Sequence, residues 1–271
     1  MEAKKEIQIE ELKKIQLDIL LSIHDFCKEN HIQYSLADGS LLGAIRHQGY
    51  IPWDDDIDIC LLRSDYERLI ELFPQLYRGR IAMISLERDE QWACPFAKAY
   101  RVNTTFQEES LNNKRQIGIG IDVFPLDEVP DEDKEWKSYN RKRKLLVSLL
   151  ILKWMKWRRG RSLLKNMIAL ASKFFLFPFS FRQIAVWIDR YSQKNNSKGY
   201  NYLYENCMGM IIKNRFEKSA FSKTKEAIFE GHHVMIMEGY DNCLSNFYGN
   251  YMQLPPENKR ISHHAFKAYW K

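Results

Sequence analysis

The chain has 271 residues, of which 45% are hydrophobic and 13% aromatic, so it can bury a sizeable core and is not a disordered protein. Its net charge of +6 is unevenly placed, because thirteen Lys or Arg and no Asp or Glu lie between Lys137 and Ile188, which leaves the remainder mildly acidic. The five cysteines are scattered and form no CxxC pair, which disfavours a zinc ribbon or a disulfide framework and favours buried, idle thiols.

The N-terminal stretch from Met1 to Glu10 is charged and lacks the apolar region of a signal peptide. No run of residues reaches the ~18 apolar positions that a spanning helix requires. These absences predict a cytoplasmic protein, for which a peripheral contact with the inner face of the cell membrane stays open.

Hydrophobic periodicity predicts alternating helices and strands in the first half of the chain. A period of three and four residues predicts a helix over residues 7–29, and a capping-box pattern that begins at Ser64 predicts another that runs to about Phe73. A short helix is expected from Leu41 to His47. Strands are expected over residues 33–37, 57–62, 81–86, 96–102 and 120–124. This alternation predicts an α/β or α+β catalytic domain.

The character of the chain changes after Pro130. Residues 132–195 are basic, rich in Trp and Phe and predicted to be mainly helical, and a further helix is expected over residues 238–247. We therefore expect a catalytic domain (1–130), a basic helical lobe (131–198) and a C-terminal segment that packs back on the catalytic domain (199–271). The lobe either lies on an anionic membrane, with Trp154 and Trp157 at the interface, or meets a polyanionic acceptor. No base-reading motif supports a nucleic-acid partner.

An acidic cluster is the strongest functional signal. Asp54, Asp55, Asp56 and Asp58 lie between apolar neighbours, and two unit charges ~4 Å apart repel by roughly 4 kcal/mol at an effective dielectric near 20. A divalent cation reverses the sign of this energy. In an extended chain Asp56 and Asp58 point to the same face and can hold Mg²⁺, with Mn²⁺ as an alternative. Asp54 and Asp55 are expected as outer ligands or loop caps, and a solvated acidic turn is the competing interpretation.

Two-metal chemistry needs a third carboxylate. Asp122 lies in the apolar, strand-like stretch 119–125, where an unpaired charge is costly, so a metal shared with Asp56 and Asp58 would provide its partner. A carboxylate that is hydrogen-bonded at a strand end is the alternative. Asp127 lies closer to a turn and is the weaker candidate.

Gly39 and Ser40 precede the acidic cluster. Glycine lets a backbone approach a phosphate closely, and a helix that starts at Leu41 would offer free N–H groups to an anion. The whole block GSLLGAIRHQGYIPWDDDID (residues 39–58) resembles the signature of the LicD family, bacterial phosphorylcholine-transferase-like proteins that are distantly similar to fukutin and fukutin-related protein. The resemblance continues at IDVFPLD (121–127), FYG (247–249), LPPENKR (254–260) and His263, and is weakest in the basic middle.

This resemblance implies a nucleotidyltransferase fold of the DNA-polymerase-beta type, a mixed sheet with a largely helical basic lobe. In that superfamily a Gly-Ser turn precedes an Asp-x-Asp strand, and a third Asp follows on a later strand. The matching residues are Gly39, Ser40, Asp56, Asp58 and Asp122. The insertion from Arg46 to Trp53 lengthens the usual spacing and resembles the LicD form.

The resemblance also implies a reaction. A phospho-substituent, typically phosphocholine from CDP-choline, would move to a hydroxyl of a cell-surface glycan or a teichoic-acid or lipid-linked precursor, with release of CMP. Asp56, Asp58 and Asp122 would hold the metals, and Asp122 would accept the hydroxyl proton. Gly39, Ser40 and Arg46 would contact phosphate. The donor headgroup stays open among choline, ethanolamine, ribitol and glycerol.

Several further residues are candidates for substrate binding. Arg260 and His263 would stabilise the leaving CMP, with a surface arginine and a packing histidine as the alternatives. Lys98 is a weaker phosphate candidate. A quaternary ammonium favours an aromatic wall, for which Trp53, Trp92 and Tyr100 are candidates unless they lie in the core. Two other functions compete with the transferase: a metal-dependent glycosyltransferase that uses a nucleotide sugar, and a non-catalytic, membrane-associated glycan-assembly factor.

Overall fold

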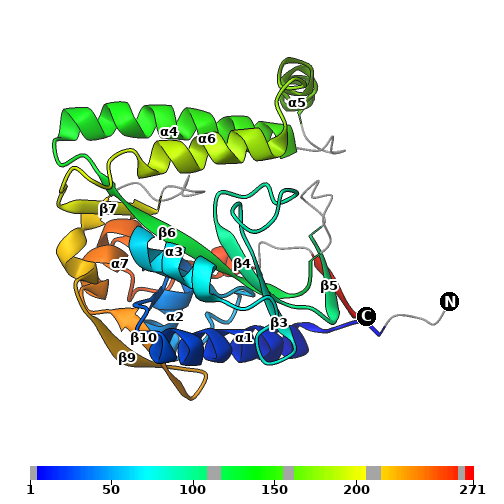
Figure 1. Cartoon of the computed structure of the whole chain (residues 1–271), viewed down its shortest axis with the longest axis vertical. Helices are drawn as coiled ribbons and strands as arrows, with labels where there is room; N and C mark the ends of the chain where they lie inside the picture. The colour runs from blue at the N-terminus through cyan, green and yellow to red at the C-terminus, as the bar shows by residue number, and fades with distance from the viewer. Residues whose placement is uncertain (1–4, 109–116, 155–161, 206–214, 262–265) are drawn as a thin grey trace.

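The computed structural model describes residues 5–108, 117–154, 162–205, 215–261 and 266–271. A seven-stranded mixed sheet forms the centre, with the strand order β1-β2-β6-β4-β3, and β7 and β8 extend it beside β6 (Figure 1). The strands of this sheet are β1 (Ser35–Leu36), β2 (Asp58–Leu62), β3 (Ile81–Ile84), β4 (Ala97–Arg101), β6 (Gly120–Val129), β7 (Tyr202–Glu205) and β8 (Phe216–Glu217). The expected α+β class is therefore confirmed.

The long strand β6 organises the sheet. It pairs with β2 in parallel along one edge, and along the other edge it pairs antiparallel first with β4 and then with β7. The strand was expected only over residues 120–124, but it runs on through Pro125 to Val129. On this edge of β6, the pairing with β4 ends at Val123 and the pairing with β7 begins at Leu126. Pro125 therefore lies between the two pairings, where its missing N–H removes no hydrogen bond on that edge.

Helices cover this sheet. Helix α1 (Ile9–Glu29) buries Leu12, Ile19 and Ile23 and contacts β4 and β6, which confirms the periodic pattern. Helix α2 (Asp38–His47) contacts β2, and α3 (Arg63–Leu72) contacts β2 and β6. The capping box at Ser64 was wrong, because α3 begins one residue earlier, after Leu62, and has no side-chain cap.

The remaining elements lie in the second half of the chain. Helices α4 (Asp133–Trp154), α5 (Leu163–Phe175) and α6 (Phe181–Gln193) confirm the helical character of the basic segment and form the upper layer in Figure 1. Helix α7 (Tyr240–Tyr248) and two short 3₁₀ turns, η1 (Lys218–Phe221) and η2 (Glu257–Lys259), follow. Among the helices that the structure describes, none combines the length and the hydropathy that crossing a membrane would need.

Two small antiparallel sheets were not expected from the sequence. One is the hairpin of β9 (Thr224–Phe229) and β10 (His232–Met237), and the other joins β5 (Thr104–Glu108) to β11 (Phe266–Trp270). The N-terminal segment adds to the second, because the backbone N–H of Ile7 donates to the carbonyl of Ala268 at 2.8 Å. Both ends of the described chain therefore meet at β11, next to β5 (Figure 1).

Four cysteines, Cys27, Cys60, Cys94 and Cys243, are buried free thiols, as expected, whereas Cys207 lies outside the described residues.

Candidate active site

Three charged residues form a row across adjacent strands. Asp58 is the first residue of β2, and its partner in the parallel pairing with β6 is Asp122. On the other side of β6, Lys98 of β4 is paired with Asp122, and its Nζ lies 2.8 Å from Asp122 Oδ1. Both of these side chains are partly exposed. The structure therefore has Asp58 and Asp122 on neighbouring strands, where the sequence analysis expected them.

The loop before β2 carries the closest group of acids. Asp54, Asp55 and Asp56 can each offer a carboxylate oxygen, and these oxygens all lie within 4.8 Å of one another. Asp55 is buried, while Asp54 and Asp56 are partly exposed. Asp54 and Asp55 were expected only as outer ligands or loop caps, because strand alternation does not predict how the loop before β2 folds.

The alternation itself holds at the start of β2. Ile57 and Ile59 are fully buried, whereas Asp56 and Asp58, which alternate with them, are partly exposed. Apolar side chains therefore anchor the segment in the core, and the acids are left at the surface of the sheet edge.

The acids repel one another strongly enough to affect their ionisation. Burial and then the negative charges of Asp56 and Asp122 raise the pKa of the Asp58 carboxyl well above its usual range. A divalent cation would relieve this repulsion, and an all-oxygen set of carboxylates is the kind of site that Mg²⁺ or Mn²⁺ prefers. The residues present therefore fit such an ion.

The N-terminus of α2 holds these acids in place. The Asp58 N–H donates to Ser40 Oγ, and the Ala37 N–H donates to the Asp58 carbonyl, each at 2.9 Å. A Cβ atom on Gly39 would lie 2.5 Å from Asp54 Oδ2, so a larger residue would force that carboxylate to move. Because α2 begins at Asp38 and not at Leu41, Gly39 and Ser40 lie within its first turn, and their contact with phosphate stays a prediction.

Asp38 is a residue that the sequence analysis missed. It has a left-handed backbone with φ of 43° and begins α2. Burial and then the charge of Asp54 raise the pKa of its carboxyl to about 6. The Tyr248 phenol has its pKa raised by burial and by Asp38, Asp58 and Asp54, so α7 also approaches the acids. The position of Asp38 directly before Gly-Ser was the only sequence signal for it.

A pocket of about 80 Å³ opens beside the row of charges. Its lining includes Asp55, Asp56, Lys98 and Asp122 together with an aromatic pair, Phe106 and Phe266. The two rings are stacked, with centroids 5.4 Å apart and planes at 27°. No sequence signal predicted this pair, because it forms only when β5 and β11 join distant parts of the chain.

The aromatic residues that line this pocket are not the ones expected from the sequence. Trp92 is a core residue, 2% exposed, and its Nε1 donates to the Phe96 carbonyl at 2.7 Å, so its assignment to the wall was wrong. Tyr100 lies on β4, partly buried, and does not line this pocket.

The remaining predicted binding residues lie apart from the pocket. The Arg260 guanidinium lies 5.8 Å from the centre of the Trp53 ring, so these two candidates meet each other. Arg46 donates to the Tyr251 carbonyl at 2.7 Å and links α2 to the segment after α7. Neither Arg46, Trp53 nor Arg260 lines the pocket beside the acids, and His263 lies outside the described residues.

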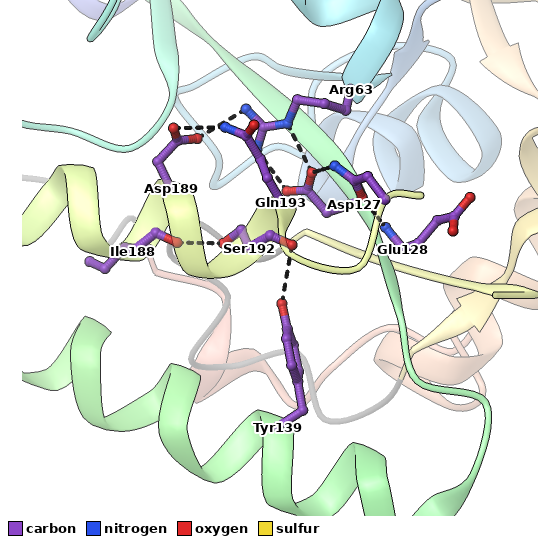
Figure 2. A network of polar contacts seen from close by, with 9 residues as sticks. Arg63, Asp127, Glu128, Tyr139, Ile188, Asp189, Ser192 and Gln193 are labelled. Atoms are coloured by element: carbon purple, nitrogen blue, oxygen red, sulfur yellow. Dashed lines mark hydrogen bonds and ion pairs between the residues drawn. The ribbon is translucent and has the colours of Figure 1, made fainter. Parts of the chain in front are cut away.

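Asp127, the weaker candidate for a third carboxylate, has a structural role. It is fully buried, and Arg63 donates to both of its oxygens at 2.8 and 2.7 Å. Asn196 donates to it at 2.6 Å, and Arg63 also contacts Asp189 of α6 at 3.0 Å (Figure 2). This network joins β6 and α3 to α6 at the opposite end of β2 from Asp58.

Comparison with known proteins agrees with this geometry. Residues 31–150 match the family described as LicD/FKTN/FKRP, nucleotidyltransferase domain. The chain is 31% identical over 269 residues to the lipopolysaccharide cholinephosphotransferase LicD of Haemophilus influenzae, covering 98% of this chain and 99% of that protein. An uncharacterized protein of Rickettsia typhi is 39% identical over 72 residues (26% of this chain and 23% of that protein), and one of Rickettsia prowazekii is 42% identical over 57 residues (21% of each chain). Since the Haemophilus relative aligns along almost its whole length, this chain belongs to the LicD family.

Proposed function

We propose that this chain is a Mg²⁺-dependent phosphotransferase. It moves phosphocholine from CDP-choline to a hydroxyl of a cell-surface glycan, a lipopolysaccharide or teichoic-acid precursor, and releases CMP. The observation that carries the proposal is the register of Asp58 with Asp122 beside the Asp54–Asp56 loop, in a chain that aligns end to end with a cholinephosphotransferase.

Asp56, Asp58 and Asp122 would hold the divalent cation, with Asp54 and Asp55 close enough to contribute. When bound, such an ion neutralises phosphate oxygens and the charge that develops on the leaving group. Mn²⁺ has the same ligand preference and is the expected substitute.

The chain's own residues supply the rest of the reaction. The acceptor oxygen attacks the phosphorus of the phosphocholine group, and the bond from that phosphorus to the CMP oxygen breaks. Asp122 accepts the hydroxyl proton, and CMP leaves with the electron pair of the broken bond. The Lys98 ammonium, 2.8 Å from Asp122 Oδ1, holds this carboxylate in place and puts a positive charge beside the phosphates.

The aromatic pair supports choline as the headgroup. A trimethylammonium group is attracted to aromatic faces and to carboxylates, and the pocket presents Phe106 and Phe266 next to Asp55 and Asp56. Ethanolamine, with its smaller and more strongly hydrated ammonium, and uncharged glycerol or ribitol gain less from such a wall.

Release of CMP tests the proposal. The purified chain is incubated with Mg²⁺, CDP-choline and a glycan acceptor, and CMP and the phosphocholine-bearing product are quantified by chromatography and mass spectrometry. We expect turnover that EDTA abolishes and Mg²⁺ or Mn²⁺ restores.

Asp58→Asn should eliminate turnover, whereas Asp25→Asn, which alters an exposed aspartate on α1 that pairs with Arg78, should not. Turnover that survives both EDTA and Asp58→Asn would refute the metal-based mechanism. Release of UDP from a nucleotide sugar, with none of CMP from CDP-choline, would favour the glycosyltransferase. A chain that consumes no donor at all would favour a non-catalytic assembly factor.

A further inference from the structure

Helix α5 exposes its apolar side chains instead of burying them. Leu163 is 77% exposed, Phe174 is 79% exposed and Phe177, in the turn that follows the helix, is 84% exposed. Other large apolar side chains with exposed fractions between 46% and 74% are Leu164, Met167, Ile168, Leu170 and Phe175. We call these eight residues the α5 surface. Single exposed apolar residues are ordinary, but a contiguous patch on one helix marks an interaction site.

Helices α4 and α6 contact the segment that directly follows α5. The Lys153 ammonium of α4 donates to the Leu176 carbonyl at 2.7 Å, and the Leu176 side chain is buried. Phe179 packs edge-on against Trp187 of α6 with ring centroids 5.1 Å apart. In Figure 1, α5 stands at the outer corner of the layer that α4 and α6 form. The helix is therefore anchored to the body of the molecule while its large apolar side chains remain in solvent.

Positive charge accompanies this apolar surface. No acidic residue occurs between Lys137 and Ile188, where the sequence carries thirteen basic ones. In the first half of α4, away from the contact of Lys153 with the segment after α5, the side chains of Lys137, Arg141, Lys142 and Lys144 are exposed. The same layer thus combines large apolar groups with a surplus of cations.

We propose that the α5 surface docks onto an anionic lipid bilayer. A helix of 13 residues is about 20 Å long, too short to span a bilayer but suited to lie in the plane of its interface. Phenyl and aliphatic groups of α5 enter the acyl boundary, and the surplus positive charge of the helical layer attracts the anionic lipid headgroups. A second copy of this chain fits less well, because it would bring an equal block of positive charge against the first.

This assignment differs from the interface expected from the sequence. Trp154, one of the two tryptophans expected there, is only 9% exposed and packs in the core, while Trp157 lies outside the described residues. The aromatic residues that contact lipid are instead Phe174, Phe175 and Phe177. The docking does not depend on the proposed transferase activity, since none of these residues lines the acidic pocket.

Vesicle co-sedimentation tests the docking with the full chain. We expect binding to vesicles of phosphatidylcholine and phosphatidylglycerol (3:1), and weak binding to vesicles of phosphatidylcholine alone. The variant Phe174→Ser/Phe175→Ser/Phe177→Ser should lower the partition coefficient by at least about 100-fold, because three apolar side chains lose their lipid environment. Its melting temperature should remain near that of the wild type, because all three side chains are solvent-exposed.

The matched control removes apolar surface elsewhere. Leu72 and Leu76 are each 46% exposed and lie at and just beyond the end of α3, so Leu72→Ser/Leu76→Ser should bind anionic vesicles like the wild type. The proposal is overturned if the wild-type chain does not bind anionic vesicles, or if the control variant loses as much binding as the triple-phenylalanine variant. It is also overturned if the wild-type chain is a dimer in solution and the triple-phenylalanine substitution makes it a monomer. If the triple-phenylalanine variant no longer binds vesicles but still releases CMP at the wild-type rate, membrane docking and catalysis are separate properties.

Discussion

Removing the Asp127 carboxylate should destabilise the protein more than removing any acid of the pocket. Asp127 is fully buried, and Arg63, its bidentate partner, is 8% exposed. Loss of one member of a buried pair leaves an uncompensated charge and typically costs about 3–5 kcal/mol. In Asp127→Ala, Arg63 keeps its contact with Asp189 at 3.0 Å, so we expect the lower end of this range, about 3 kcal/mol.

Urea unfolding monitored by tryptophan fluorescence measures this loss. With an m-value of about 3 kcal/mol/M, a destabilisation of this size lowers the unfolding midpoint by about 1 M urea. Asp65→Ala is the matched control, because its ion pair with Arg68 is exposed and worth under about 1 kcal/mol. The double variant Arg63→Met/Asp127→Leu should recover much of the stability, since it removes both buried charges.

The reasoning fails if Asp127→Ala loses no more stability than Asp65→Ala. It also fails if Asp127→Ala keeps its stability and loses all turnover, because Asp127 would then belong to the active site. A double variant that is less stable than Asp127→Ala would show that the network gives more than charge compensation.

Three further predictions concern the acidic site. Asp58→Asn should keep or raise the melting temperature in EDTA, because it removes a repelling charge; a fall of several degrees would contradict this. In the folded protein the pKa of Asp38 is raised to about 6, so the folded state retains a proton that the unfolded state releases. The free energy of unfolding in EDTA should therefore fall by up to about 3 kcal/mol as the pH rises from 4 to 7. Asp38→Asn, which tolerates the left-handed backbone, should flatten this part of the profile, and parallel profiles would refute the assignment. Phe106→Leu should raise the KM for CDP-choline more than that for CDP-glycerol, while Phe106→Tyr should not; equal effects on both donors would remove the headgroup role.

Local patterns predicted the parts of the site that neighbours in sequence determine. The acids and isoleucines at the start of β2 alternate as expected, and an apolar stretch with one aspartate predicted the partner strand. The capping box failed because tertiary contact took precedence: Arg63 begins α3 and contacts Asp127, so the helix starts before Ser64. Local helix propensity cannot predict such contacts between distant residues.

Contacts between distant segments escaped the sequence analysis altogether. The pairing of β5 with β11 puts Phe106 and Phe266 together, although neither residue is conspicuous in its own segment. The position of the Asp54 carboxylate likewise involves another element, because Gly39 of α2 leaves space for it. Register between strands can be inferred from alternation, but which strand closes a pocket depends on the whole chain.

The pairing of β5 with β11 also affects the order in which the protein folds during synthesis. Translation proceeds from the N-terminus, so the aspartates leave the ribosome long before Phe266 does. The acids can therefore come together in a nascent chain while the pocket still lacks one of its two aromatic rings. Closing so long a loop is entropically slow, so we infer that the acidic centre forms first and that substrate selectivity is acquired last.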